Sequence, residues 1–166
     1  MVVLIFIKKH VIKPADKEDL ACYVSEYESA GLDGACGSAD AVNIVCDKAS
    51  CKLRQKNLGH KQSLTTRTCN VTCTRRRRIT HVTSGFPARW NDKTIVKFDE
   101  HVNKVKGKKL YDDVKFRLCD RKTDGSIIEV WHTGAWVLCN NGYLKWSTLI
   151  SLIKLTLDRK EVRFSE

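Results

Sequence analysis

Hydrophobic and polar residues recur with helical spacing in two stretches of the chain. The first stretch begins after Asp16 and ends at Gly31, and its apolar stripe consists of Leu20, Val24 and Tyr27. The second begins after Asn91, a residue type that caps helices, and ends at Gly107. Its stripe consists of Ile95, Phe98, Val102 and Val105. Apolar positions three and four residues apart line one side of an α-helix, so the pattern predicts two amphipathic helices.

Two short apolar runs, residues 41–46 and 135–139, predict buried strands. Both are rich in β-branched or aromatic residues, and both are too short for a helix. Residues 47–63 and the stretch after Tyr143 show little periodicity, and we expect them to be largely irregular.

Four further runs predict two pairs of adjacent strands. Residues 68–74 alternate between polar side chains and thiol or apolar ones, which is typical of a half-buried strand, and residues 79–83 follow after a short turn. Residues 114–118 and 127–131 flank the Asp124-Gly125 pair, which favours a β-hairpin with a longer loop. Together with the helices, these strands predict an α/β fold. A chain of 166 residues is long enough for one such domain.

The composition is strongly basic and changes the functional picture. Lys and Arg number 30 against 19 acids, which gives a net charge of +11. Such a charge favours a polyanionic partner, above all nucleic acid, although charges that only solvate the surface explain the same count. Four arginines, Arg75, Arg76, Arg77 and Arg78, lie at the turn between two predicted strands. There they form a phosphate-binding site or a nuclear import signal, or else a solvated turn.

The apolar start of the chain is short. Residues 1–7 are followed by Lys8, Lys9 and His10, and this run is shorter than a signal-peptide core or a membrane span. We therefore expect a protein that is not secreted and has no membrane partner. The 8 cysteines then predict reduced thiols, and because no two of them have CxxC spacing, they do not predict structural zinc.

Polar residues stand where the two predicted buried strands begin and end. Asp40 precedes the run 41–46, and Asn140 and Asn141 follow the run 135–139. Neighbouring strand ends bring together residues that are far apart in sequence. These positions are therefore a candidate ligand cluster.

Other polar and aromatic candidates have ordinary structural explanations. Asp92 is expected to support the start of the second helix, whereas Asp112 and Asp113 are expected to point to opposite faces of an extended segment. His81 and His132 lie in predicted strands as core or edge residues. Three tryptophans are candidates for stacking on unpaired bases: Trp90, Trp131 and Trp146. The fourth, Trp136, is expected in the core.

Several short motifs follow one another in a fixed order along the chain. They are residues 26–44, which contain GSADAVNI, then 69–72 (CNVT), 85–94 (GFPARWNDKT), 134–136 (GAW) and 141–148 (NGYLKWST). In this order they resemble the nuclease domain of Harbinger-like DDE transposases, from about Val11 to the end of the chain. The resemblance is specific, because several unrelated motifs occur in the right order.

The resemblance implies a fold and a function. The fold is ribonuclease-H-like, with a mixed five-stranded sheet flanked by helices and three carboxylates that hold two divalent cations, Mg²⁺ or Mn²⁺. Residues 1–34 are then an N-terminal helical segment, and residues 35–166 are a partial DDE endonuclease domain that is incomplete at its C-terminus. DNA is the implied substrate, and a separate DNA-binding protein is an implied partner. The implied location is the nucleus, with the cytoplasm as the alternative.

The site implied by the resemblance is degenerate. Asp40 matches the first catalytic acid and metal ligand, Asn140 stands where the second acid is usual, and Asn43 stands where a His is usual. The third acid, a Glu, lies beyond the end of the chain, and Glu166 does not match it. A neutral amide offers Mg²⁺ an oxygen without a charge. We therefore expect weak or no metal binding and no normal DNA cleavage.

Three interpretations are open at this point. The chain is a decayed DDE endonuclease domain that keeps its fold and has largely lost catalysis. Alternatively, it is a domesticated module that binds nucleic acid or protein without chemistry. In the third interpretation, gene prediction has cut the chain short, and later exons add the missing Glu.

Overall fold

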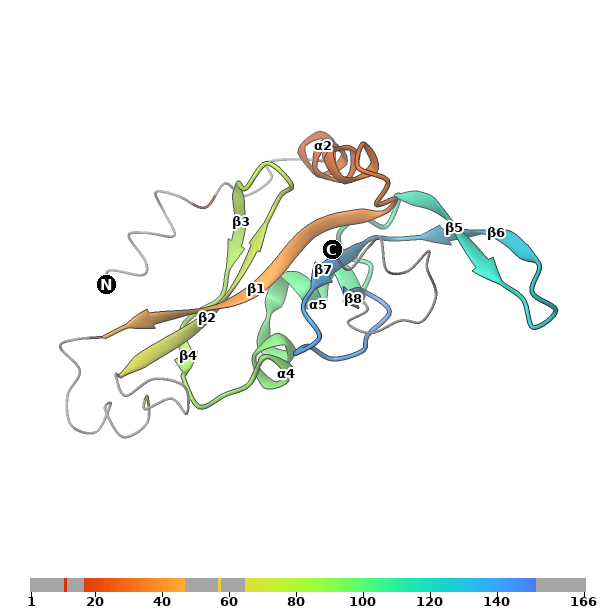
Figure 1. Cartoon of the computed structure of the whole chain (residues 1–166). Coiled ribbons are helices and arrows are strands. Elements are labelled where there is room, and N and C mark those ends of the chain that lie inside the picture. The colour runs from red at the N-terminus through yellow and green to blue at the C-terminus, as the bar shows by residue number, and fades with distance from the viewer. Residues whose placement is uncertain (1–10, 12–16, 47–56, 58–64, 152–166) are drawn as a thin grey trace.

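The computed structural model describes residue 11, residues 17–46, residue 57 and residues 65–151, which form a mixed β-sheet with helices packed against it (Figure 1). The strands lie in the spatial order β3 (Ile79–Val82), β2 (Thr66–Cys73), β1 (Ala35–Val45), β7 (Trp136–Cys139) and β8 (Leu149–Ser151), and β4 (Phe86–Pro87) pairs with β2. The helical elements are α2 (Lys17–Glu28), α4 (Asp92–Ile95), the 3₁₀ helix η1 (Val96–Phe98) and α5 (Glu100–Lys106). The chain is therefore α/β, as the sequence predicts.

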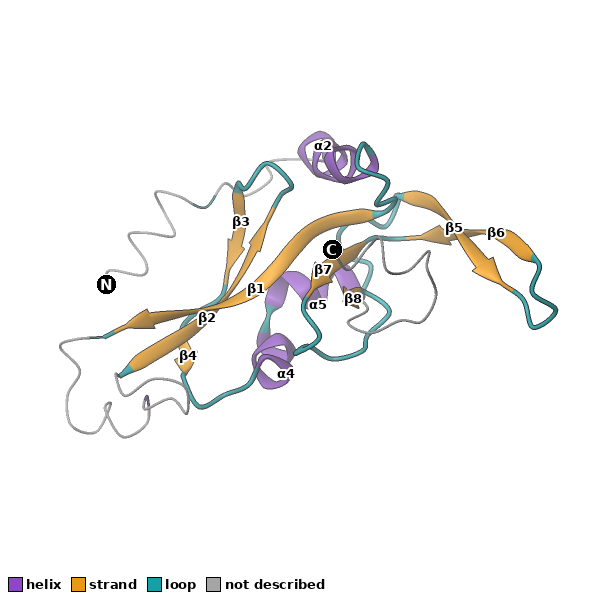
Figure 2. Ribbon diagram, viewed as in Figure 1, coloured by secondary structure: helices purple, strands orange, loops and turns teal. Residues whose placement is uncertain are grey.

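The main sheet changes character at β1. Strands β1, β2 and β3 are antiparallel neighbours, whereas β7 runs parallel to β1 and β8 runs parallel to β7. Within β1, residues 35–39 pair with β7, while residues 38–45 pair with β2. Beyond Ala39, β1 continues with β2 as its one described strand neighbour, while β3 and β4 pair with the other edge of β2. Figure 2 shows this part of β1 extending to the left.

This second part of β1 corrects the prediction of a buried strand over residues 41–46. The strand is confirmed and begins earlier, at Ala35. Its second half is not buried, because Val42 is 46% exposed and Val45 is 45% exposed. The physical reason is that β7 ends opposite Ala39, so this part of β1 has a described strand neighbour on one side only.

Strand β2 is confirmed, and its polar face is the more buried one. Thr68, Asn70 and Thr72 are almost completely buried, whereas Val71 and Cys73 are only partly buried. Buried polar side chains need hydrogen-bond partners. Thr68 Oγ1 donates to Asn43 Oδ1 and Asn70 Nδ2 donates to Asp99 Oδ2, both at 2.6 Å, whereas Thr72 Oγ1 has no hydrogen-bond partner in the described part of the chain. The polar pattern of this strand therefore marks buried positions, two of them hydrogen-bonded, rather than a solvent-facing side.

The first predicted helix is confirmed as α2, although Asp16 lies outside the described residues. The second, between Asn91 and Gly107, is wrong as a single helix. Asn91 caps α4 and Gly107 ends α5, but Asp99 has an extended backbone and its carboxylate accepts the backbone N–H three residues later. Asp99 therefore starts a new helix. The break leaves Phe98 56% exposed rather than in the apolar stripe.

The core lies against the two central strands, β1 and β7. Val24 from α2 and Val102 from α5 belong to one buried cluster with Cys36 and Val137 of the sheet. Trp136, the neighbour of Val137, belongs to a second cluster, with Tyr27, Ala35 and Phe116. Adjacent strand residues point to opposite faces, so both faces of β7 are covered. The prediction that Trp136 lies in the core is confirmed.

The remaining sequence predictions fall into three groups. The hairpin is confirmed as β5 (Lys115–Arg121) and β6 (Ile127–Thr133), a separate two-stranded sheet, and the strand over 135–139 is confirmed as β7. The stretch after Tyr143, expected to be irregular, instead contains strand β8, which runs parallel to β7. The sequence does not reveal this strand, because it is three residues long and belongs to no hairpin in the described part of the chain. Most of residues 47–63 lie outside the described residues.

No helix among the described residues is long and apolar enough to cross a membrane. The cysteines among them are free thiols.

Candidate functional site

Asp40 and Asn140 meet where the parallel pairing between β1 and β7 ends. Ala39 and Cys139 are the last register partners, so the next residues of the two strands are Asp40 and Asn140. The Asn140 side-chain amide donates a hydrogen bond from Nδ2 to Asp40 Oδ1, 3.2 Å away. Parallel strands end at the same edge of a sheet. This geometry explains why two residues 100 positions apart become neighbours.

The Asn140 amide uses both of its ends. Its Oδ1 accepts a hydrogen bond from the Gly142 backbone N–H at 2.7 Å, while its Nδ2 donates to Asp40. Asp40 Oδ1 also accepts the Ala41 backbone N–H at 2.8 Å. An aspartate at position 140 would have no N–H to donate, and its carboxylate would repel that of Asp40. The amide of Asn140 instead forms a hydrogen bond with Asp40.

Asp92 is the third polar side chain at this site. A Cβ placed on Gly142 would lie 2.6 Å from Asp92 Oδ2 and 2.8 Å from Asn140 Oδ1, so both oxygens border the Gly142 backbone. The expectation that Asp92 supports the helix start is incomplete, because the Asn91 side chain accepts the Thr94 N–H and caps α4. An Asp directly after a cap residue is ordinary for a helix start, so only the fold shows that Asp92 borders the site.

These residues do not fit the two-cation centre that the resemblance implies. Asp40 Oδ1 accepts two N–H groups, and the amide oxygen of Asn140 accepts a third. Two divalent cations close together require several anionic oxygens around them. Among the described residues, no three His, Cys, Asp or Glu side chains are grouped so that they could hold a metal ion.

A buried network anchors the turn that carries Asn140. The Tyr143 hydroxyl donates to Asn70 Oδ1 at 2.5 Å, and Asn70 Nδ2 donates to Asp99 Oδ2 at 2.6 Å. Asn70 and Asp99 are 0% exposed. Burial, together with the carboxylates of Asp92 and Asp40, raises the pKa of Tyr143, so its hydroxyl stays protonated as the donor. The end of β7 is therefore tied through β2 to the start of α5.

Two histidines border this network. His81 Nε2 lies 3.5 Å from Asp99 Oδ1, and the rings of His81 and His101 stack with centroids 5.4 Å apart. The pKa of His101 is lowered to about 4, chiefly by burial; the nearby His81 acts in the same direction and Asp99 opposes the shift. His101 is therefore neutral at physiological pH. The placement of His81 in a strand at the edge of the core agrees with the sequence prediction.

The four arginines lie at the β2–β3 turn, as predicted. All four are exposed. Arg76 also binds the body of the protein, because its Nε lies 3.4 Å from Glu26 Oε1 of α2 and its backbone N–H donates to the same carboxylate. The turn is four residues along β2 from Val71, the register partner of Asp40, or about 13 Å at roughly 3.3 Å per strand residue. The arginines are therefore a separate surface, not part of the Asp40 site.

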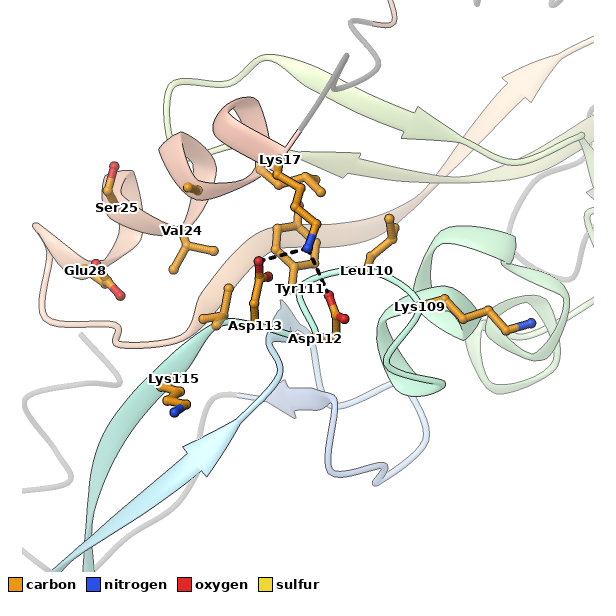
Figure 3. Close-up of a pocket in the computed structure, with 13 residues that line it drawn as sticks. Lys17, Val24, Ser25, Glu28, Lys109, Leu110, Tyr111, Asp112, Asp113 and Lys115 are labelled. Atoms are coloured by element: carbon orange, nitrogen blue, oxygen red, sulfur yellow. Dashed lines mark hydrogen bonds and ion pairs between the residues drawn. The ribbon is translucent and has the colours of Figure 1, made fainter.

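A cleft of about 740 Å³ lies between α2 and residues 109–115 (Figure 3). Neither Asp40 nor Asn140 lines this cleft. Lys17 Nζ lies 3.1 Å from Asp113 Oδ2 and 3.9 Å from Asp112 Oδ1. The prediction that these two acids point to opposite faces is wrong, because their segment is a turn rather than a strand. The ion pairs are exposed, so they contribute little stability.

Comparisons with known proteins leave the family open. No protein-family model, curated protein or solved structure matches the chain. The likeness to Harbinger-like DDE nucleases therefore rests on the sequence motifs alone.

We expect His101 to make the protein less stable as the pH falls from 6.5 to 4. The folded-state pKa of about 4 lies below the ordinary value of 6.5, so in this range the unfolded chain binds a proton that the folded chain does not. The loss amounts to at most about 3 kcal/mol, at 1.36 kcal/mol per pKa unit. Urea unfolding across this range should give a flatter pH dependence for His101→Gln than for the wild type.

The matched control is His132→Gln. His132 stacks on Phe116 with centroids 5.5 Å apart and lies outside the network. This variant should keep the wild-type slope. Equal slopes for the wild type and His101→Gln would contradict the assignment of a buried neutral His101.

Proposed function

We propose that the chain is a ribonuclease-H-like domain of the Harbinger-like DDE type that binds DNA and no longer cleaves it in the normal way. The observation that carries the proposal is the hydrogen bond from Asn140 to Asp40 across the ends of β7 and β1. The two positions that the motifs match to the first and second catalytic acids are neighbours in space. One of the two is an amide that binds the other.

The sheet supports the ribonuclease-H-like part of the proposal. The fold implied by the motifs has a mixed five-stranded sheet flanked by helices, and the main path of the described sheet is β3-β2-β1-β7-β8. Asp40 lies on its central strand, and Asn140 follows the adjacent parallel strand. Residues at the ends of central parallel strands are where α/β proteins place their sites.

The chemistry of the site supports loss of cleavage. Phosphodiester hydrolysis with two cations needs anionic ligands that activate a water and stabilise the leaving oxygen. Asp40 and Asp92 supply carboxylates, but Asn140 supplies none, and its amide oxygen accepts the Gly142 N–H. We propose that Mg²⁺ and Mn²⁺ bind this site weakly or not at all.

Charge supports DNA as the partner. The chain carries +11, and the side chains of the β2–β3 arginine turn are exposed to solvent. Duplex DNA is a dense polyanion, and proteins that bind it release its counterions. The proposal places the protein in the nucleus, where a separate DNA-binding protein supplies target choice.

We expect Asn140→Asp to create a weak magnesium site without restoring cleavage. The change adds a carboxylate at the second DDE position, next to Asp40 and Asp92. Because it loses the hydrogen bond to Asp40 and adds charge repulsion, the variant without metal should lose about 1 kcal/mol of unfolding free energy. Mg²⁺ should restore this stability in the variant and leave the wild type unchanged. Plasmid nicking should stay at background, because the third acid of the DDE set is still missing. Urea unfolding with EDTA or Mg²⁺ and a nicking assay measure both effects.

The control is Asn141→Asp, which makes the same charge change one residue away. It should show neither the loss nor the response to Mg²⁺. Two results would overturn the proposal of lost cleavage. One is Mg²⁺-dependent nicking by the wild type. The other is robust nicking by Asn140→Asp that disappears when Asp40→Ala is added.

We expect binding to duplex DNA to weaken steeply with added salt, and the arginine turn to carry part of this dependence. Replacing Arg75, Arg77 and Arg78 with Gln should flatten the slope of log affinity against log salt by about 0.9 for each phosphate that the variant no longer neutralises. Arg76 is kept because it binds Glu26. Fluorescence anisotropy with a labelled duplex measures the slope.

The matched control removes three charges from the β5–β6 hairpin, with Gln at Lys115, Arg121 and Lys122. These side chains are also exposed. An equal flattening by both triple variants would contradict a specific role for the turn. Absence of duplex binding at low salt would sink the DNA-binding proposal itself.

A further inference from the structure

Three aromatic side chains pack together in the segment that carries Asp92. Phe86 comes from β4, Trp90 from the turn before α4, and Phe98 from η1. The Phe86 and Trp90 centroids lie 5.3 Å apart with planes at 18°, and the Trp90 and Phe98 centroids lie 5.4 Å apart at 33°. Phe98 is nevertheless 56% exposed. Two rings therefore hold a third ring that still faces solvent, which is a preformed surface for stacking.

A cleft of about 260 Å³ opens beside Phe98. Thr83 and Ser84 line it from the end of β3, and Glu100 lines it from the start of α5. Hydroxyl and carboxylate groups hydrogen-bond the edges of a planar polar ring, while Phe98 offers its face. This combination suits a nucleobase better than a purely apolar group.

Exposed cations lie on the same segment. Arg89, Lys93 and Lys97 follow one another at four-residue spacing, before and within α4 and η1. Among the described residues, none of these three cations belongs to an ion pair. These cations are therefore available to the phosphates of a strand whose base stacks on Phe98.

We propose that Phe98 and its cleft bind an unpaired base of a DNA strand, with Arg89, Lys93 and Lys97 along the backbone of that strand. The inference rests on the proposed DNA-binding function and names single-stranded or distorted DNA as its preferred form. Asp92 lies two residues after Trp90 and borders Gly142, so the segment that carries the aromatic rings also reaches the Asp40 site. A protein partner would use the aromatic face but has no uniform anionic backbone for the three cations.

The test is the affinity for a short labelled oligothymidine, measured by fluorescence anisotropy with the whole chain. Phe98→Ala should weaken this affinity about tenfold, since stacking of one base on an aromatic side chain is worth roughly 1–3 kcal/mol. Phe98→Tyr keeps the aromatic face and should stay within about twofold of the wild type. Urea unfolding of each variant checks that the fold is retained.

The matched control is Trp131→Ala on the β5–β6 hairpin. Trp131, a stacking candidate from the sequence, is 69% exposed and lies outside the aromatic cluster, so its removal tests the alternative that this tryptophan supplies the stacking ring. This variant should bind oligothymidine like the wild type. An equal loss for Trp131→Ala and Phe98→Ala would overturn the assignment to Phe98.

Duplex binding separates this inference from the proposed function. Phe98→Ala should leave affinity for a blunt duplex within about twofold of the wild type, because that affinity is set by charge. Normal duplex binding together with unchanged oligothymidine binding by Phe98→Ala would overturn the stacking site alone, and would leave the aromatic face to a protein partner. Absence of duplex binding by the wild type would overturn the proposed function.

Discussion

The parallel pairing of β1 with β7 is the constraint on which the candidate site depends. It ends at the Ala39–Cys139 register pair, so Asp40 and Asn140 lie side by side at the same edge of the sheet. A slip of one residue would turn one of these side chains to the opposite face. The same ending explains why the second half of β1 is exposed, because β1 continues beyond Ala39 with only β2 as a described neighbour. One register therefore sets both the position of the site and the exposure of the strand beside it.

A buried polar network keeps that register connected to the rest of the fold. Tyr143 follows the Asn140 turn and binds Asn70 on β2, which in turn binds Asp99 at the start of α5. Unpaired polar groups at such depth would cost several kcal/mol, so the three residues stabilise the fold only as a set. On the surface side of this network, Asn140 donates a hydrogen bond to Asp40. The network and the sheet together therefore fix the positions of Asn140 and Asp40 relative to each other.

Local patterns in the sequence predict most elements, and contacts between distant segments account for the rest. Spacing, turn residues and alternation identify α2, β2 and the β5–β6 hairpin, because the signals of each element are local in the sequence. The pattern does not reveal the break at Asp99, because a buried cap inside an apolar stripe looks like a polar residue on the solvent side. The burial of Asn70 depends on partners from α5 and from the turn after β7. Strand ends predict the Asp40–Asn140 pairing, whereas Asp92 joins the site only through the fold.

We propose that the Asn140–Asp40 hydrogen bond stands in place of a metal-bridged pair of acids. The most direct measurement is a double-mutant cycle on unfolding free energy with Asp40→Ala, Asn140→Ala and the double variant, in EDTA and again in Mg²⁺. The account predicts a favourable coupling of about 1 kcal/mol that is the same in both conditions. A coupling near zero in EDTA that becomes favourable only with Mg²⁺ would contradict it, and would mean that the two side chains still share a cation.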